Sequence, residues 1–503
     1  MTFKTTVREL LNAIPYSCFY GDIDREISGI TCSSKEVEPL NVFAALKGFK
    51  EDGTKYIDEA IEKGASAILT HREPFEEKHK NRAWIVCQNE RYSFSAASSF
   101  LYPLENEPPK LVGVTGTNGK TTIVYLLRSI FKVAGGGAIL STIEYDDGKT
   151  LREAQRTTPE AHFIHKWLKE ISNLKIPYAA IEVSSHSLEL HRVSSLKFDA
   201  CGFTNLTRDH LDFHKTMENY FETKKKLFDL QKEDGFSVIN IENDFGLRLS
   251  NELKGKRIFK VGLSSSADIY PQDISMNLEG IEATAVTPFE KVRIKSSLPG
   301  SYNLLNILFA IAFSKGLGIE REAIEEGITA LKGVPGRVER VDVGQDFYVF
   351  VDYAHSDDAL KNLLLNIKPL TEKRIITVFG CGGDRDKTKR PLMGAVSTKL
   401  SDVVILTSDN SRSENPEDIA KEVETGILSE MNPSKKYIKE LDRREAIKKA
   451  FSIARSGDTV VIAGKGHEKT QTAKGITIPF HDPTVAYEIL KEMFNEKVFS
   501  KRV

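Results

Sequence analysis

The sequence predicts an α/β fold in three domains whose sheets are mainly parallel. Its 503 residues correspond to three domains at about 150 residues per domain. Short β-rich runs alternate with helix-like stretches, which is the pattern of βαβ units. Two breaker-rich segments, PLENEPPK (103–110) and GVPGRVERV (333–341), separate the chain into residues 1–108, 109–334 and 335–503.

Each segment contains recognisable strands and helices. Residues 1–108 contain predicted strands at 67–70 and 84–87. Residues 109–334 open with a predicted strand at 111–115 and a helix at 122–131. The predicted strands of the third segment are FYVFVDYA, RIITVFG, VVILTS and TVVIAG, and its predicted helices include 357–367 and 443–453. Such parallel sheets bind ligands at the carboxyl ends of their strands.

The composition is that of an ordinary globular protein, with 40% hydrophobic, 28% charged and 9% aromatic residues. The 70 Lys and Arg residues balance 71 Asp and Glu residues, so no basic excess indicates nucleic acid or a membrane surface. Five scattered cysteines form no C-x-x-C pair, which argues against a disulfide framework or a zinc ribbon. No apolar stretch has the length of a signal peptide or a membrane span. We expect a soluble, cytoplasmic protein.

The strongest motif is GVTGTNGKTT at residues 113–122, where a strand meets a glycine-containing loop and a helix. Backbone N–H groups at the positive end of a helix can bind phosphate oxygens. Lys120 would then contact the β- and γ-phosphates, and the hydroxyl of Thr121 would ligate Mg²⁺. The sequence therefore predicts a loop that binds a nucleotide triphosphate.

The motif departs by one residue from the usual G-x-x-x-x-G-K-[ST] spacing. Val114 stands where the first glycine belongs, and Gly113 comes one place early. The alternative is a chance glycine turn before a helix, which the strand–loop–helix context and the GKT core oppose. A phosphate loop alone leaves ATPase, GTPase, kinase and ligase open.

Two later segments supply carboxylates and histidines at predicted strand ends. Glu182 follows the apolar PYAAI, so its carboxylate could hold a metal. A second group, in FTNLTRDHLDFH (203–214), comprises Asp209, His210, Asp212 and His214. These residue types suit a divalent cation, although Mg²⁺ prefers oxygen ligands. For His191 and His214, a surface or core role is equally favoured.

Nine motifs in order resemble those of the Mur ligase family, the ATP-dependent amino-acid-adding enzymes of peptidoglycan synthesis. They are TGTNGKTT, EVSSHSLELHRV, FTNLTRDHLDFH, LPGSYNLLNILFAIA, PGRVERV, DYAHSDDAL, FGCGGDRDKTKRPLMG, DNSRSENP and GKGHE. The resemblance covers essentially the whole chain. It implies a UDP-sugar-binding domain (1–108), a central P-loop-type ATPase domain (109–334) and a C-terminal Rossmann-like domain that binds the amino acid (335–503).

The same resemblance implies the reaction. ATP would phosphorylate a substrate carboxylate to an acyl phosphate, and an amine would then displace phosphate, with ADP and phosphate as products. The implied substrates are UDP-N-acetylmuramoyl-L-alanyl-D-glutamate and meso-diaminopimelate, and the implied cofactors are ATP and Mg²⁺. We expect a monomer with small-molecule substrates.

The resemblance also implies the residues of the ATP site. The triphosphate loop would comprise Gly116, Thr117, Asn118, Gly119, Lys120, Thr121 and Thr122. Asn303 resembles an adenine contact, and Arg337 and Asp352 match nucleotide contacts in the third domain. Thr121, Glu182, His210 and Lys224 would hold the metal, with Lys224 carrying CO₂ as a carbamate. The catalytic residues would be Lys120, Lys224 and His210.

Two further sets of residues would bind the other substrates. The UDP-sugar-dipeptide set is Ser34 with Lys35, Gly48, Phe49, Lys50, Thr157, Thr158, Ser184 and Arg192. The diamino-acid set is Arg385, Asp409, Asn410, Ser411, Arg412, Gly464 and Glu468. Arg412 would select diaminopimelate because its guanidinium fork fits a carboxylate that lysine lacks. Glu468 would bind the distal ammonium.

The motifs depart from the family pattern at three points. Residues 32–35 read Cys-Ser-Ser-Lys where Asp-Ser-Arg is usual, and Leu190 replaces a polar residue before His-Arg. Ser411 replaces the proline of D-N-P-R, a change that would loosen the loop before Arg412.

Several alternatives stay open from the sequence. Lys224 to Lys226 could be a solvated basic helix face, and Arg412 a surface residue paired with Glu414 or Glu417. The added amino acid could be L-lysine. The chain could also be another amide ligase, such as a folylpolyglutamate synthetase or a different Mur step, or a P-loop switch with no covalent product.

Overall fold

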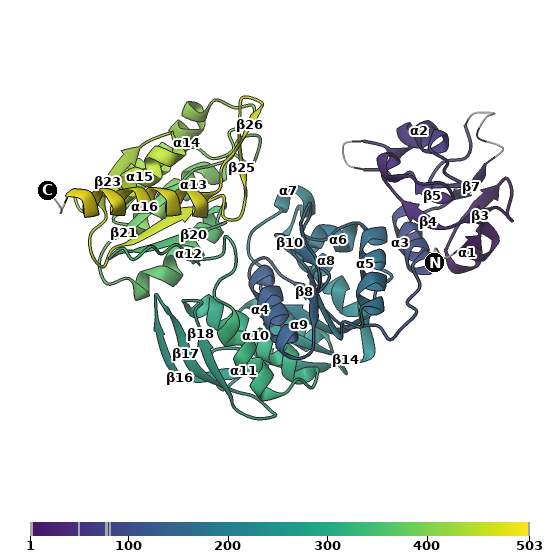
Figure 1. The fold of residues 1–503 in the computed structure, drawn as a ribbon, viewed down its shortest axis with the longest axis horizontal. Helices are drawn as coiled ribbons and strands as arrows, with labels where there is room; N and C mark the ends of the chain where they lie inside the picture. The colour runs from purple at the N-terminus through teal and green to yellow at the C-terminus, as the bar shows by residue number, and fades with distance from the viewer. Residues whose placement is uncertain (1–3, 49–50, 76–78, 80–81, 501–503) are drawn as a thin grey trace. The chain divides into compact units, whose positions relative to one another are not determined.

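The structure is a computed structural model that describes residues 4–48, 51–75, 79 and 82–500 (Figure 1). Packing divides the chain into two units, Met1–Lys260 with Ala312–Ala323, and Val261–Ile311 with Ile324–Val503. The division falls within helices α10 (Ser301–Gly316) and α11 (Arg321–Ala330). The boundaries near residues 108 and 334 stay a prediction.

The first unit begins with a five-stranded sheet in the order β2-β7-β6-β5-β4. Strands β4 to β7 run parallel, and β2 is antiparallel to β7. The two faces of the sheet pack differently because side chains alternate along a strand. Val42 and Ala44 pack in one core with α1 and α3, whereas Phe43 and Ala45 pack in another with α2. The elements are β1 (Thr5–Thr6), α1 (Val7–Ala13), β2 (Cys18–Tyr20), β3 (Glu26–Ile27), β4 (Gly29–Thr31), η1 (Ser34–Glu36), β5 (Asn41–Ala44), η2 (Gly53–Tyr56), α2 (Ile57–Glu62), β6 (Ala67–Thr70), β7 (Ala83–Val86) and α3 (Glu90–Leu101).

An eight-stranded sheet forms the rest of this unit, in the order β11-β10-β9-β12-β8-β13-β14-β15. Strands β9, β12, β8, β13 and β14 are parallel. The carboxyl ends of β12, β8 and β13 therefore lie side by side, with Glu182 opposite Val114 and Phe203 opposite Thr115. The elements are β8 (Lys110–Thr115), α4 (Lys120–Val133), β9 (Gly137–Leu140), β10 (Glu144–Asp146), β11 (Leu151–Glu153), α5 (Ala161–Asn173), β12 (Tyr178–Glu182), α6 (Ser185–Glu189), β13 (Phe198–Phe203), α7 (Leu211–His214), α8 (Met217–Lys225), η4 (Lys226–Leu230), β14 (Gln231–Asn240), α9 (Asp244–Glu252) and β15 (Arg257–Val261).

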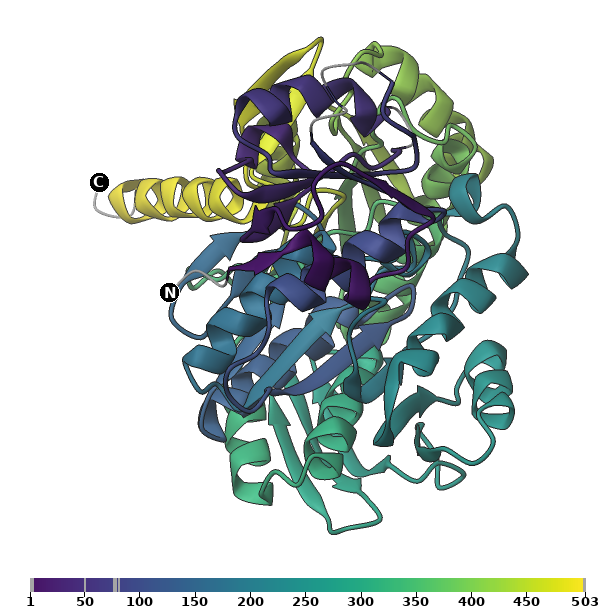
Figure 2. The same ribbon diagram turned by 90° about the vertical axis from the view of Figure 1, so that its right-hand side faces the viewer.

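The second unit contains a three-stranded antiparallel sheet and a six-stranded sheet in the order β19-β20-β24-β21-β22-β23. All strands of the larger sheet except β19 are parallel. Helices α12, α13 and α14 pack on one face of it, and α15 and α16 on the other. Helix α16 is seen side-on in Figure 2. The elements are β16 (Tyr270–Asn277), β17 (Gly280–Val286), β18 (Val292–Ser296), β19 (Glu339–Arg340), β20 (Tyr348–Asp352), α12 (Asp357–Ile367), η5 (Lys368–Leu370), β21 (Ile375–Phe379), α13 (Lys389–Leu400), β22 (Val403–Leu406), α14 (Pro416–Ser429), β23 (Lys436–Lys439), α15 (Arg443–Ile453), β24 (Thr459–Ala463), β25 (Thr470–Ala473), β26 (Ile476–Pro479) and α16 (Asp482–Ser500).

The predicted α/β class with mainly parallel sheets is confirmed. Helices 357–367 and 443–453 match α12 and α15 to the residue. Within the described ranges, no helix combines the length and the apolar character that a membrane crossing requires.

Candidate functional site

The predicted phosphate loop joins β8 to α4, as the sequence indicated. Gly116 has φ +144°, and a Cβ at this position would overlap the hydroxyl of Thr204, so only glycine fits. The loop is anchored to the end of β13, because Thr204 donates to the carbonyl of Asn118 at 2.6 Å and Asn205 Oδ1 accepts from its N–H at 2.9 Å. The amino end of α4 is thereby fixed beside the strand ends.

Lys120 is the first residue of α4, and its side chain folds back over the loop. Its Nζ donates to the carbonyl oxygens of Gly116 and Thr117, both at 2.9 Å. These contacts hold the ammonium next to the loop that would bind the phosphates. The position agrees with the predicted role of Lys120 as a charge-stabilising cation.

Glu182 lies at the end of β12 and is fully buried. Its Oε2 accepts from the hydroxyls of Thr121 and Thr142, both at 3.1 Å, and its Oε1 accepts from the backbone N–H of Thr142 at 2.9 Å. A buried carboxylate against the helix hydroxyl of a phosphate loop offers the oxygen ligands that Mg²⁺ prefers. Thr142 was missed by the sequence analysis, and no motif marks it.

Lys224 lies on α8 and is 1% exposed, so the solvated basic face predicted as an alternative is wrong for this residue. Its Nζ donates to the carbonyl of Gly116 at 2.9 Å and lies 4.6 Å from the centre of the Tyr220 ring. Burial, reinforced by the charge of Lys120, lowers the pKa of Lys224 well below its ordinary value. Lys225 and Lys226 instead form ion pairs with Glu252 and Glu189.

His210 has φ +53° and precedes the short helix α7. Its Nε2 lies 3.6 Å from Asp209 Oδ2, and its ring packs edge-on against His186 at 5.1 Å between centroids. Burial lowers the pKa of His210, Asp209 opposes this shift, and the charges of Lys120 and Lys224 reinforce it. His210 is therefore electrostatically coupled to the two lysines of the loop.

The other two candidate histidines, His214 and His191, contact side chains of the protein. His214 Nε2 lies 2.9 Å from the hydroxyl of Ser185, and burial lowers the pKa of His214 to about 4. His191 contacts Asn89 and Ser194 at 3.2 and 3.0 Å. In the part of the chain that the structure describes, no three His, Cys, Asp or Glu side chains form a metal-binding group by themselves. The predicted metal set depends instead on Thr121 and Lys224.

Most of the predicted dipeptide-binding residues in the central segment lie next to Glu182. Thr158 donates to the backbone carbonyl of Glu182 at 2.7 Å and accepts from the N–H of Ser184 at 3.1 Å. Arg192 donates to the carbonyl of Thr158 at 2.9 Å and pairs with Glu160 at 2.9 Å. Thr157 accepts from the hydroxyl of Thr142 at 3.2 Å. The structure thus gathers these residues at one edge of the sheet.

The predicted residues of the N-terminal segment are placed separately. Ser34 is buried and donates to Glu59 at 2.7 Å, and Lys63 donates to its carbonyl at 3.0 Å. Gly48 donates its N–H to the carbonyl of Glu51 at 2.8 Å. Phe49 and Lys50, which were predicted with Gly48, lie outside the described residues.

Asn303, Arg337 and Asp352 belong to the second unit. Asn303 is buried in the first turn of α10 and donates to the carbonyl of Pro299 at 2.9 Å. The Asp352 carboxylate accepts from the N–H groups of Val338 and Ala354, both at 2.8 Å, and burial raises its pKa. The Arg337 guanidinium lies 5.0 Å above the ring of Tyr353.

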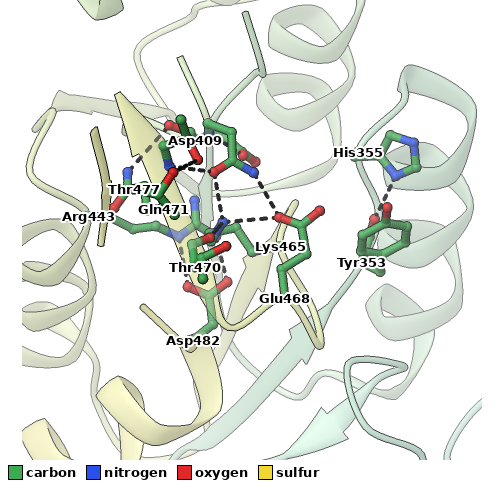
Figure 3. A network of polar contacts seen from close by, with 12 residues as sticks. Tyr353, His355, Asp409, Arg443, Lys465, Glu468, Thr470, Gln471, Thr477 and Asp482 are labelled. Atoms are coloured by element: carbon green, nitrogen blue, oxygen red, sulfur yellow. Dashed lines mark hydrogen bonds and ion pairs between the residues drawn. The ribbon is translucent and has the colours of Figure 1, made fainter. Parts of the chain in front are cut away.

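Two of the predicted diamino-acid residues, Asp409 and Glu468, lie within one network of polar contacts in the second unit (Figure 3). Asn410 donates to Glu468 Oε2 at 2.8 Å and accepts from the N–H of Thr472 at 2.9 Å. Lys465, which is fully buried, donates to the same Oε2 at 3.1 Å. Asp409 is buried, and a Cβ at Gly464 would lie 2.8 Å from its Oδ2.

Lys465 was missed as a site residue although it stands inside the GKGHE motif. Its ammonium also donates to the carbonyl of Thr470 at 2.7 Å. It therefore ties the β25–β26 hairpin to Glu468. A second feature that no motif marks is the buried ion pair between Arg443 and Asp482, at 2.7 Å. The Arg443 guanidinium also donates to the carbonyl of Ala463 at 3.0 Å.

Arg412 has φ +51°, and its backbone N–H donates to the carbonyl of Thr472 at 3.1 Å. Its Nη1 donates to the carbonyl of Gly383 at 2.6 Å. The surface pairing with Glu414 or Glu417 does not occur, because Glu414 pairs with Arg390 at 2.8 Å and Glu417 with Lys439 at 2.7 Å. Arg412 is thus held between two backbone segments.

Comparison with known proteins finds one family. Residues 26–95 match its "Mur ligase family, catalytic domain", residues 114–314 its "Mur ligase middle domain" and residues 336–466 its "Mur ligase, glutamate ligase domain". A relative from Clostridium tetani, UDP-N-acetylmuramoyl-L-alanyl-D-glutamate–2,6-diaminopimelate ligase, is 40% identical over 97% of this chain and 100% of its own length. The chain belongs to the Mur ligase family.

Solved structures agree with this assignment. A UDP-N-acetylmuramoyl-L-alanyl-D-glutamate–2,6-diaminopimelate ligase is 28% identical, with a TM-score of 0.70 over 98% of this chain and 100% of that chain. The MurF ligase of Thermotoga maritima, solved in complex with ADP, is 20% identical and has a TM-score of 0.61 over 94% of this chain and 98% of that chain. The second likeness shows the fold alone.

Proposed function

We propose that this protein is an ATP-dependent ligase that adds meso-diaminopimelate to UDP-N-acetylmuramoyl-L-alanyl-D-glutamate in peptidoglycan precursor synthesis. The similarity to the Clostridium tetani ligase over nearly the full chain supports this substrate pair. The structural observation that carries the proposal is the loop after β8, where Lys120 lies on the loop carbonyls and Thr121 contacts the buried Glu182. The three segments 1–108, 109–334 and 335–503 would bind the UDP-sugar, ATP and the diamino acid.

The reaction proceeds in two displacements. A carboxylate of the D-glutamyl residue attacks the γ-phosphorus of ATP, and ADP leaves. An amine of diaminopimelate then attacks the acyl carbon, and the amide forms as phosphate leaves and takes up the proton that the amine loses. The protein contributes mainly positioning and charge stabilisation.

The ATP site would use the loop N–H groups and Lys120 to stabilise charge on the γ-phosphoryl group. The oxygens of Thr121 and Glu182 fit a divalent cation, and His210 and a Lys224 carbamate would complete the set that holds Mg²⁺. When bound, Mg²⁺ would neutralise negative charge on the phosphates. Asn303 would contact adenine, and Arg337 and Asp352 the nucleotide.

The dipeptide site would use the cluster next to Glu182. Arg192 supplies a cation for a substrate carboxylate or pyrophosphate, and Thr157, Thr158 and Ser184 supply hydroxyls. Ser34, Lys35 and residues 48–50 would bind the UDP-sugar. The adjacency of Thr158 to Glu182 supports a carboxylate placed close to the phosphate loop.

The diamino acid would bind at Arg385, Asp409, Asn410, Ser411, Gly464 and Glu468, with its distal carboxylate on Arg412. L-lysine, the alternative substrate, has no such carboxylate and would leave the guanidinium of Arg412 without a partner, which disfavours it. We expect a monomeric, cytoplasmic enzyme with these small-molecule substrates.

The test measures product formation with a panel of amino acids. The purified protein, ATP, Mg²⁺ and the UDP-muramyl dipeptide are incubated with meso-diaminopimelate or L-lysine, and the UDP-muramyl tripeptide is quantified by mass spectrometry beside phosphate release. We expect tripeptide with meso-diaminopimelate. ATP hydrolysis without any amide product would contradict the ligase and favour a P-loop switch.

A further inference from the structure

Two loops of the second unit, residues 380–388 and 407–415, carry Arg412, which is predicted to bind the distal carboxylate, and Arg385, which is predicted to belong to the same pocket. They are bonded to each other in both directions. The N–H of Gly383 donates to the carbonyl of Asn410 at 2.9 Å, and Arg412 Nη1 donates to the carbonyl of Gly383 at 2.6 Å. The position of one arginine therefore depends on the loop that carries the other.

A second set of bonds lies further along the same loops. The Asp384 carboxylate accepts from the hydroxyl of Ser413 at 2.6 Å and from its N–H at 3.2 Å. In return, the N–H of Asp384 donates to Glu414 Oε1 at 2.6 Å. Glu414 belongs to the loop of Arg412, and its carboxylate thus binds the backbone of the loop that carries Arg385.

Arg390 holds the carboxylate of Glu414 in place. It lies on α13, it is fully buried, and its guanidinium binds both oxygens of Glu414, at 3.0 and 2.8 Å. The same guanidinium pairs with Glu422 of α14 at 2.8 Å and donates to the carbonyl of Gly382 at 3.3 Å. Arg390 therefore contacts both loops and two helices, yet it is too deeply buried to contact a ligand.

The loops approach so closely that they have little freedom to move separately. A Cβ at Gly383 would overlap the carbonyl of Ser411. Ser411 is the residue that replaces the family's proline, so the loop lacks the rigid ring at this point. The Arg390–Glu414 ion pair restrains the same loop three residues later.

We propose that Arg390 and Glu414 are positioning residues that hold Arg412 and Arg385 for the distal carboxylate of the added diamino acid. The inference rests on the proposed function, because it assumes that this carboxylate binds between the two loops. A bidentate guanidinium–carboxylate contact requires defined geometry, so a small displacement of either arginine weakens it. L-lysine has no distal carboxylate, so its use does not depend on this alignment.

The experiment compares Glu414→Gln with the wild-type enzyme on meso-diaminopimelate and on L-lysine. We expect kcat/KM for meso-diaminopimelate to fall by at least about tenfold, mainly through KM. The kcat/KM for L-lysine and the KM for ATP should not change. Glu417→Gln is the matched control, because Glu417 forms an exposed pair with Lys439 and should leave both substrates unaffected.

Two further variants separate positioning from folding. Glu414→Asp keeps the charge and should restore part of the preference for meso-diaminopimelate. Arg390→Lys keeps the buried charge but cannot bind Glu414, Glu422 and Gly382 together, and it should act like Glu414→Gln. Thermal unfolding verifies that the variants fold.

Three outcomes would overturn the inference. If a folded Glu414→Gln enzyme keeps the wild-type kcat/KM for meso-diaminopimelate, the inference is wrong, and the proposed function is unaffected. If kcat/KM falls equally with both amino acids, Glu414 has a general structural role and does not position the arginines for the distal carboxylate. Wild-type enzyme that uses L-lysine as well as meso-diaminopimelate would overturn the proposed specificity and this inference together.

Discussion

The side-chain nitrogens of Lys120 and Lys224 both donate to the carbonyl oxygen of Gly116, each at 2.9 Å. Two ammonium groups at one carbonyl repel each other, and the one on Lys224 is also fully buried. Loss of the proton from Lys224 removes both this repulsion and the cost of a buried charge, in agreement with the lowered pKa of Lys224. A neutral amine beside a phosphate loop is the form that reacts with CO₂.

We predict that Lys224 acts as a carbamate. Ligase activity should fall in CO₂-depleted buffer and return with bicarbonate, and it should fall further at lower pH, where the amine is protonated. Lys224→Ala should be nearly inactive, unresponsive to bicarbonate and partly restored by acetate. Lys225→Ala, which removes an exposed ion pair on the same helix, is the control. Full activity of a folded Lys224→Ala enzyme would contradict the prediction.

Lys120→Ala should leave the fold intact and lower turnover by about a hundredfold or more, which corresponds to the loss of one electrostatic contact of about 3 kcal/mol. The measurement is kcat from phosphate release at saturating substrates. Lys132→Ala changes an exposed lysine in the last turn of the same helix and should retain normal turnover. Near-normal rates in a folded Lys120→Ala protein would overturn the ATP-site assignment.

Arg412→Ala should lose most of the preference for meso-diaminopimelate over L-lysine, because the distal carboxylate loses its guanidinium partner. The readout is the ratio of kcat/KM values for the two amino acids. Arg444→Ala removes a surface arginine paired with Glu488 and should leave that ratio unchanged. A ratio that persists in Arg412→Ala would assign the selection to other residues.

His165 should make the first unit sensitive to acid. It is buried in α5, its Nε2 has no hydrogen-bond partner among the described residues, and burial lowers its pKa from 6.5 to about 4. The unfolded chain therefore binds this proton more readily between those values, so the stabilisation present above pH 6.5 is lost as the pH falls. Between pH 7 and 5 the loss is roughly 2 kcal/mol.

The check is urea unfolding at both pH values, followed by tryptophan fluorescence. Both tryptophans, Trp84 and Trp167, lie in the first unit, so the signal reports on that unit. His165→Leu should remove the roughly 2 kcal/mol pH-dependent part of the free energy of unfolding. An identical pH dependence in wild type and variant would show that His165 is not responsible.

Local signals in the sequence were sufficient to predict the elements that frame the sites. Helices α12 and α15 begin after Ser356 and Asp442, whose side chains accept from the N–H groups of Ala359 and Glu445. Such capping and a buried apolar face are both visible in sequence. The motif residues of the phosphate loop likewise occupy the strand–loop–helix turn predicted for them.

The contacts between distant segments could not be predicted. Thr142 reaches Glu182 across 40 residues, and Arg390 reaches Glu414 across 24. The reason for a glycine at position 113, inside the predicted strand 111–115, could not be predicted either. Gly113 lies inside β8, where a Cβ would be within 3 Å of the Phe198 ring. Packing against Phe198 of β13 leaves no room for a side chain at this position, which loop spacing does not reveal.

The contacts of Glu468 bear on inhibitor design. Lys465 and Asn410 both bind Oε2, and among the described residues none of the hydrogen bonds reaches Oε1. A ligand can therefore address this carboxylate through one oxygen only. A primary amine fits that requirement, whereas an amidine or guanidine would have to displace the buried Lys465 to use both of its donors. Compounds aimed at this pocket should carry a single-point cation.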